Sequence, residues 1–153
     1  MKPLLAIAFL FLGLISRAAD APAAPAAMPP PPTEVMVFNH VQVDDAFAKG
    51  LPLQGNSSFK ISAGRRVMPG TVELHTRDTD ILYVTDGTAT FITGGKMVDA
   101  KPSGPDEVRG TSITGGVAHQ LNKGDLIIVP AGIPHWFSDV KGTFLYLVIK
   151  VTR

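Results

Sequence analysis

The stretch that decides the fold is Gly124–His135, which reads GDLIIVPAGIPH. Four consecutive aliphatic residues, Leu126–Val129, are typical of a buried strand, and the turn Pro130–Gly132 ends it. Side chains alternate between the two faces of a strand, so His135 and Phe137 share one face of the strand that follows. The sequence therefore predicts a histidine that reaches into a β-structure directly after a rigid turn.

Similar short runs fill most of the chain, rich in Val, Ile, Thr and aromatic residues and separated by Gly, Pro, Asp or Asn. We expect strands at 36–41, 57–63, 70–76, 80–86, 88–93, 107–113, 117–121, 125–130, 134–138 and 143–151. The last of these is the densest, and it should lie centrally in a sheet. Many short strands, with no internal repeat and no βαβ pattern, predict an all-β barrel or sandwich.

Three further local signals refine this pattern. Asp86-Gly87 lies between two strand-like runs and predicts a hairpin, because that turn type needs positive φ. Val41–Lys49 predicts a short helix that stops at Gly50. The segment 97–107 contains Lys, Pro, Ser and Gly and is expected to be a surface loop.

The N-terminal segment predicts export. Residues 1–18 carry Lys2, then a 13-residue apolar run, then small residues, as in a secretory signal peptide. The alternative is an uncleaved membrane anchor, but the run is shorter than the roughly 20 residues that span a bilayer. Residues 19–33 are rich in Ala and Pro and predict a disordered linker. We therefore expect one folded domain at 34–153, in the periplasm or secreted, with no stable membrane insertion after cleavage.

Composition excludes several classes of protein. The formal net charge is +1, and the closest approach to a basic patch is Arg65-Arg66, so nucleic acid is not an expected partner. The chain has no cysteine, which excludes disulfides, thiolate metal sites and thiol nucleophiles. Any metal ion must be held by histidine, carboxylate or carbonyl groups.

The segment around His135 resembles the second motif of the cupin superfamily, G-x5-P-x-G-x2-H-x3-N. Four positions of this chain match that motif: Gly124, Pro130, Gly132 and His135. Asp139 stands where the family has asparagine. The resemblance implies a double-stranded β-helix, or jelly-roll barrel, in which this histidine is a metal ligand.

The first cupin motif, G-x5-H-x-H-x3,4-E-x6-G, is matched less closely by residues 70–87. Counting back from Gly87 places Asp80 at the glutamate position, His75 at the second histidine and Glu73 at the first. The leading glycine is displaced by three residues in this register. His-x-His has therefore become Glu-x-His, and the family's glutamate has become aspartate.

By this resemblance His75, His135, Glu73 and Asp80 are candidate ligands of one divalent metal ion. Two imidazoles with one or two carboxylates suit Fe, Mn, Ni, Zn or Cu. Glu73 and His75 are two apart on a strand and so point the same way. Glu73 has an alternative partner in Arg77 on the same strand face. Asp80 is shorter than glutamate and could instead orient His75.

Other polar and aromatic residues have weaker claims. His40 and His119 match no family position and are interpreted as surface or structural residues. Arg65 and Arg66 alternate faces, so one of them could point inward to meet an anionic substrate. The strand aromatics are interpreted mainly as core residues that could also line a pocket: Tyr83, Phe91, Trp136, Phe137 and Tyr146.

Three functions are compatible with these features. The first is a metal-dependent enzyme, of oxygenase or isomerase type, that acts on a small oxygenated molecule. The second is a non-catalytic cupin that binds or senses a small molecule. The third is a metal-free epimerase-like enzyme with His75 as base. The cupin resemblance also implies a homodimer, since cupins commonly pair through their sheets.

Overall fold

The computed structural model describes residues 28–153. The expected signal peptide at 1–18 lies outside these residues, as does most of the expected linker at 19–33. Residues 28–33 form neither helix nor strand and are exposed. Within the described part, no helix has the length and apolar character needed to cross a bilayer.

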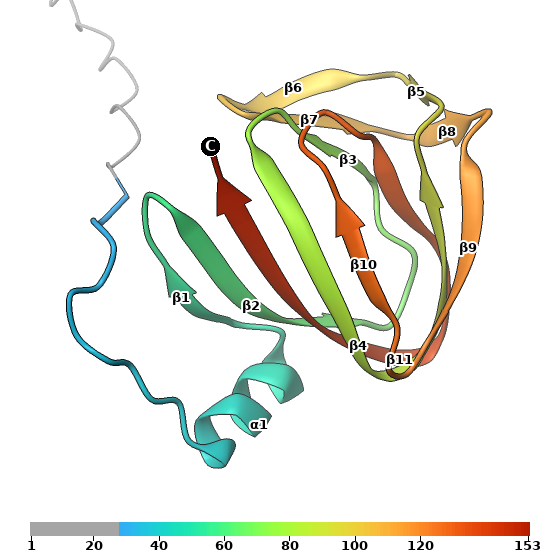
Figure 1. Ribbon diagram of the computed structural model, residues 1–153. Helices are drawn as coiled ribbons and strands as arrows, with labels where there is room; N and C mark the ends of the chain where they lie inside the picture. Colours follow the sequence, from blue (N-terminus) through green and yellow to red (C-terminus); the bar gives the residue numbers. More distant parts are fainter. Residues whose placement is uncertain (1–27) are drawn as a thin grey trace, which may run out of the picture.

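Residues 28–153 form one helix, α1 (His40–Lys49), and eleven strands, which confirms an all-β fold. The strands are β1 (Pro52–Gly55), β2 (Phe59–Arg66), β3 (Val72–His75), β4 (Asp78–Thr93), β5 (Lys96–Val98), β6 (Lys101–Gly104), β7 (Glu107–Gly110), β8 (Ser112–Thr114), β9 (Val117–Asn122), β10 (Leu126–Val129) and β11 (His135–Thr152). Figure 1 shows them curled into a barrel-like sandwich, with α1 packed below one end.

Two long strands, β4 and β11, organise the barrel. They pair antiparallel along almost their whole length, from His135 opposite Thr93 to Thr152 opposite Asp78. The second half of β11 also pairs with β2, while β9 and β10 pair with opposite halves of β4. The densest apolar run of the sequence is thus central, as expected, with β2, β3 and β4 as its neighbours (Figure 1).

The expected hairpin at Asp86-Gly87 is wrong, because β4 runs through it without reversing. Gly87 does have positive φ, at 79°. There the strand turns a corner, and the pairing with β11 shifts register beside it. A Cβ on Gly87 would overlap the Thr143 carbonyl oxygen. The glycine is therefore used for a bulged corner between the two halves of the barrel, which is a common role for positive φ in sheets.

The expected strand at 36–41 is also wrong. Asn39 caps α1 instead: its side chain accepts a hydrogen bond from the Gln42 amide, and the Gln42 side chain accepts one from the Asn39 amide. This reciprocal capping box starts the helix at His40, one residue before the predicted start. Gly50 ends it in the left-handed conformation, as predicted.

The expected loop at 97–107 contains strands. It holds parts of β5 and β7 and all of β6, a fully exposed edge strand that includes Pro102. The proline and glycine residues of this segment favoured a loop prediction. Edge strands and bulges nevertheless tolerate proline, so strand pairing is possible here. The register shift between Pro102 and Gly104 is such an irregularity.

The core lies between the two halves of the barrel. Phe91 and Phe144 are fully buried, and the rings of Phe137 and Tyr146 pack against them at centroid distances of 4.6 to 5.5 Å. The aliphatic and small members of the cluster are Leu82, Val84, Ala89, Leu121 and Val129. Three of the five strand aromatics are thus core residues, whereas Tyr83 lies on the outer face and is half exposed.

Gly64 of β2 makes room for an aromatic ring, because a Cβ built on it would overlap the ring of Tyr146. We expect Gly64→Ala to lower the free energy of unfolding by about 1–3 kcal/mol, the usual cost of overpacking a core. Urea denaturation would measure this. Gly104→Ala on β6 is the matched control: its Cβ would meet only Glu107 at 3.9 Å, so a change within about 0.5 kcal/mol is expected. Equal effects would contradict the packing argument.

Candidate metal centre

Strand pairing brings the four predicted ligands together from distant parts of the sequence. Glu73 and His75 lie on β3, and the pairing of β3 with β11 sets His135 opposite Glu73. Asp80 lies at the start of β4, opposite Lys150 of β11. The long β4–β11 ladder places Asp80 and His135, while the single β3–β11 pair and the short β3–β7 ladder place Glu73 and His75, so the side chains converge on one face at one end of the barrel.

The donor atoms are close to one another. His75 Nε2 lies 3.5 Å from Glu73 Oε2 and 3.6 Å from Asp80 Oδ2, and His135 Nε2 lies 3.7 Å from Asp80 Oδ2. One ligand atom from each of Glu73, His75 and His135 lies within 4.8 Å of the others. The two histidines and Asp80 are buried, and Glu73 is nearly so, so these donors are shielded from solvent.

His135 is oriented for ligation through Nε2. Its Nδ1 is 3.1 Å from the Ile133 carbonyl oxygen and donates to it, which leaves the Nε2 lone pair free. Burial lowers the pKa of His135, against the opposing effects of the Ile133 hydrogen bond and the Asp80 charge. The ring is therefore neutral around pH 7, as a metal ligand must be.

Glu73 is held as an anion. Burial opposes its ionisation, but the neighbouring His75 and the charges of Arg109, of His135 once it is protonated in acid, and of Arg66 outweigh burial and lower its pKa to about 2. Arg109 Nη1 donates to Oε1 at 2.7 Å, and Arg66 Nη2 lies 3.5 Å from the same atom.

The competing partner considered for Glu73, Arg77, does not contact it. The Arg77 guanidinium instead donates to the Arg153 carbonyl oxygen at 2.7 Å. The strand face that carries Glu73 is thus not shared with Arg77. Arg109 of β7 was missed by the sequence analysis, and its only signal was its place in an expected strand at 107–113.

The low pKa of Glu73 predicts a loss of stability in acid. An ordinary glutamate has a pKa of 4.5, so the full contribution of Glu73 is present above that pH and is lost as pH falls toward about 2. The difference corresponds to about 3 kcal/mol. Urea denaturation of chelator-treated protein from pH 6 to pH 2 should show this decline. Glu73→Gln should flatten it and Glu34→Gln, at an exposed position, should not; identical pH profiles for all three proteins would contradict the assignment.

Lys150, which the sequence motifs did not predict, enters the same cluster. Its Nζ lies 2.6 Å from Asp80 Oδ2 and 2.7 Å from His75 Nε2. The sequence did carry a signal: Lys150 is the single charged residue in the apolar run 144–151. It lies two and four positions from the inward-facing Val148 and Tyr146, so its side chain shares their face of the strand. A charge at that position of a central strand needs a buried partner.

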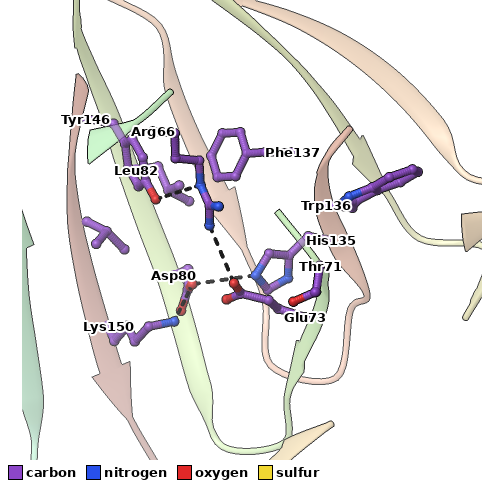
Figure 2. A pocket seen from close by; sticks show the side chains of 11 residues that line it. Arg66, Thr71, Glu73, Asp80, Leu82, His135, Trp136, Phe137, Tyr146 and Lys150 are labelled. Atoms are coloured by element: carbon purple, nitrogen blue, oxygen red, sulfur yellow. Dashed lines mark hydrogen bonds and ion pairs between the residues drawn. The ribbon is translucent and has the colours of Figure 1, made fainter. Parts of the chain in front are cut away.

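The cluster lies at the edge of a cavity of about 60 Å³, space for a few water-sized groups (Figure 2). The lining residues are Arg66, Thr71, Glu73, Asp80, Leu82, His135, Trp136, Phe137, Tyr146, Val148 and Lys150. Of the two adjacent arginines, Arg66 is the one that points inward, and Arg65 is exposed.

Arg66 forms the cationic wall of this cavity. Its Nε donates to the Tyr146 hydroxyl at 3.2 Å, and its guanidinium lies 4.6 Å from the centre of the Phe137 ring. Burial raises the pKa of Tyr146, although the Arg66 charge opposes this. The hydroxyl is therefore neutral and can donate to a ligand. His40 and His119 are exposed and lie outside the site, as interpreted from the sequence.

The residues present fit a divalent cation. Two imidazole nitrogens and two carboxylates make a donor set suited to first-row transition metals. Among the described residues, the buried Asp80 Oδ1 has no hydrogen-bond partner, an uncommon state for a carboxylate oxygen. Lys150 is the one feature that opposes the fit, because its ammonium already contacts two of the donors.

The comparisons with known proteins agree with this geometry. The model of the cupin family matches residues 31–152 of the chain, nearly all of the folded part. The chain belongs to the cupin family. No curated protein sequence matches it.

Among solved structures, this cupin is similar to a protein from Bacillus halodurans, with 12% identity, a TM-score of 0.56, and 83% of this chain and 87% of that chain covered. It is also similar to hydroquinone 1,2-dioxygenase from Sphingomonas sp. TTNP3 with 4-hydroxybenzoate bound, with 14% identity, a TM-score of 0.53, and 80% and 82% covered. Procruciferin, an 11S globulin from Brassica napus, has a TM-score of 0.44 and 18% identity; 62% of this chain is covered, but only 21% of procruciferin. At these identities the likeness to the Bacillus halodurans protein and to the dioxygenase concerns the fold.

Proposed function

We propose that this chain is an exported cupin that binds one divalent metal ion and acts on a small oxygenated molecule, with oxygenase- or isomerase-type chemistry. The observation that carries the proposal is the convergence of donor atoms from Glu73, His75 and His135 within 4.8 Å, beside a cavity. Export to the periplasm or outside the cell is supported by the signal-like pattern of residues 1–18.

Glu73, His75 and His135 would hold the metal ion, with Asp80 as a further candidate. Iron, manganese, nickel, zinc and copper all accept this donor set. Such an ion would polarise a carbonyl group or activate dioxygen. The fold is shared with a dioxygenase, which is compatible with oxygenase chemistry, but at 14% identity this likeness says nothing of the reaction.

The chain's own residues favour a small substrate with an anionic or carbonyl oxygen. The Arg66 guanidinium has only a long contact to Glu73, whose Oε1 is already bound closely by Arg109. Arg66 therefore has donors available for substrate oxygens, next to the Tyr146 hydroxyl. The apolar side chains of Leu82 and Phe137, which line the same cavity, would exclude water.

The alternative is a cupin that binds a small molecule without catalysis. One observation favours it: the Lys150 ammonium already contacts His75 and Asp80, so the cluster has a cation of its own. The cupin resemblance also implies a homodimer, which is compatible with both the enzyme and the non-catalytic alternative.

Elemental analysis of protein expressed from the whole chain and purified without chelator tests the proposal. About one equivalent of one of the five metals supports it, and the identity of the metal directs a substrate screen of small oxo and hydroxy acids and phenols. Absence of metal after reconstitution contradicts the metal-dependent function. Metal without turnover in the screen, but with saturable binding of one compound, favours the non-catalytic alternative.

A further inference from the structure

Lys150 is one of the site residues that the family motifs do not account for. Its Nζ lies within hydrogen-bond distance of two candidate donors, Asp80 Oδ2 at 2.6 Å and His75 Nε2 at 2.7 Å. Figure 2 shows its side chain reaching from β11 toward Asp80, at one side of the cavity. The Lys150 side chain is 22% exposed and that of Asp80 is 5% exposed, so the ion pair is largely withdrawn from water.

The contact with His75 uses the electron pair that a metal ion would need. An ammonium group has three donors and no acceptor, so at this distance it donates and the imidazole Nε2 accepts. A neutral imidazole has one accepting nitrogen with one lone pair. The Lys150 ammonium and a metal ion therefore exclude each other at His75 Nε2.

The backbone of Lys150 is held on both sides. It pairs with Asp80 of β4 and with Lys60 of β2, near the C-terminal end of both ladders, which continue to Thr152 and to Val151. Rotation of its flexible side chain can release His75 without breaking these pairs. The contact with Asp80 can survive such a rotation, because a carboxylate offers two oxygens and Asp80 Oδ1 is without a partner among the described residues.

We propose that Lys150 is a built-in competitor of the metal ion: its ammonium holds His75 Nε2 in the metal-free protein, must leave that atom when metal binds, and keeps Asp80 as its counter-ion. This inference rests on the proposed function. It assigns Glu73, His75 and His135 as the ligands and places Asp80 outside the set. The affinity for metal then depends on how strongly the metal ion binds His75 Nε2 compared with the Lys150 ammonium.

The test is the affinity of chelator-treated protein for Zn²⁺, measured by titration against a chromophoric competitor. Lys150→Met keeps most of the side-chain length and removes the competing charge. One charge-assisted hydrogen bond contributes roughly enough for a tenfold change in affinity, so Lys150→Met should bind Zn²⁺ about tenfold more tightly or better. Unchanged or weaker binding would overturn the proposal and leave Lys150 as a structural partner of Asp80.

Lys60→Met is the matched control. Lys60 lies opposite Lys150 on β2 and pairs at 2.8 Å with Asp78, which is two residues before Asp80 on β4. Like Lys150→Met, the variant Lys60→Met removes one positive charge, from the neighbouring strand, but Lys60 contacts no candidate ligand. The Zn²⁺ affinity of Lys60→Met should therefore stay within about twofold of the wild-type value. An equal gain in both variants would show a general charge effect and overturn the competition at His75.

A second pair of variants covers the case in which Lys150→Met does not fold because Asp80 is left unpaired. Lys150→Met/Asp80→Asn is compared with Asp80→Asn alone, and competition at His75 again predicts tighter binding in the double variant. If no protein in the series binds Zn²⁺, the proposed function fails and this inference fails with it. If all bind with equal affinity, the inference alone fails.

Discussion

Replacing His135 with alanine is expected to abolish stoichiometric metal binding while leaving the barrel folded. The imidazole provides a buried Nε2 donor that its hydrogen bond to Ile133 orients, and alanine has no donor. Loss of a residue that only supports a ligand typically costs 10- to 100-fold in affinity. We therefore expect more than about a hundredfold loss for a ligand itself, and metal content below one tenth of an equivalent after gel filtration.

His119→Ala is the matched control, since His119 is exposed on β9 and its ring is hydrogen-bonded to Thr93, outside the cluster. It should retain about one equivalent of metal. Circular dichroism and urea denaturation of each variant separate loss of metal from loss of fold. Retention of metal by His135→Ala, in a folded protein, would contradict the ligand role, and loss of metal in His119→Ala would point to adventitious surface binding in the wild type.

Phe91→Ala is expected to have the largest effect on stability, about 3–5 kcal/mol, the usual cost of removing a buried aromatic ring. Phe91 has no exposed surface, and its ring packs 4.6 Å from that of Phe137 and 5.8 Å from that of His135, centroid to centroid. The substitution therefore removes both core packing and the support of a candidate ligand. Urea denaturation gives the stability change.

Tyr83→Ala is the control on the same strand. Tyr83 lies on the outer face of β4 and is 47% exposed, so we expect a cost of about 1 kcal/mol or less, mainly from lost β-propensity. Metal affinity should fall in Phe91→Ala and stay unchanged in Tyr83→Ala. Similar stability losses at the two positions would contradict the assignment of the core to the face that bears Phe91.

The parts of the structure that sequence predicted are those with local causes. The turn before His135 and the alternation after it are set by residues in direct sequence, and the structure buries His135 and Phe137 on one face as expected. The same holds for Glu73 and His75, whose donor atoms lie 3.5 Å apart. The family's spacing then related these two short segments, which no local rule could have joined.

What sequence did not predict depends on pairing between distant strands. Lys150 and Arg109 entered the site only through the registers of β11 with β4 and of β3 with β7. Asp86-Gly87 satisfies the requirement of a hairpin and of a bulged corner equally well, and only the continuous partner strand decides between them. Asn39 and Gln42 did carry a local signal, the capping box, which the strand interpretation of 36–41 overlooked.

The dependence of the site on β11 has a consequence for the order of events in the cell. This strand follows all the others along the chain and provides His135 and Lys150, while Glu73, His75 and Asp80 come some 60 residues earlier. A chain synthesised only as far as β10 therefore has one side of the cluster, and such non-local contacts form late and slowly. Under the proposed metal-binding function, the ion can be bound by the whole cluster only after β11 has been synthesised and has paired with β3 and β4.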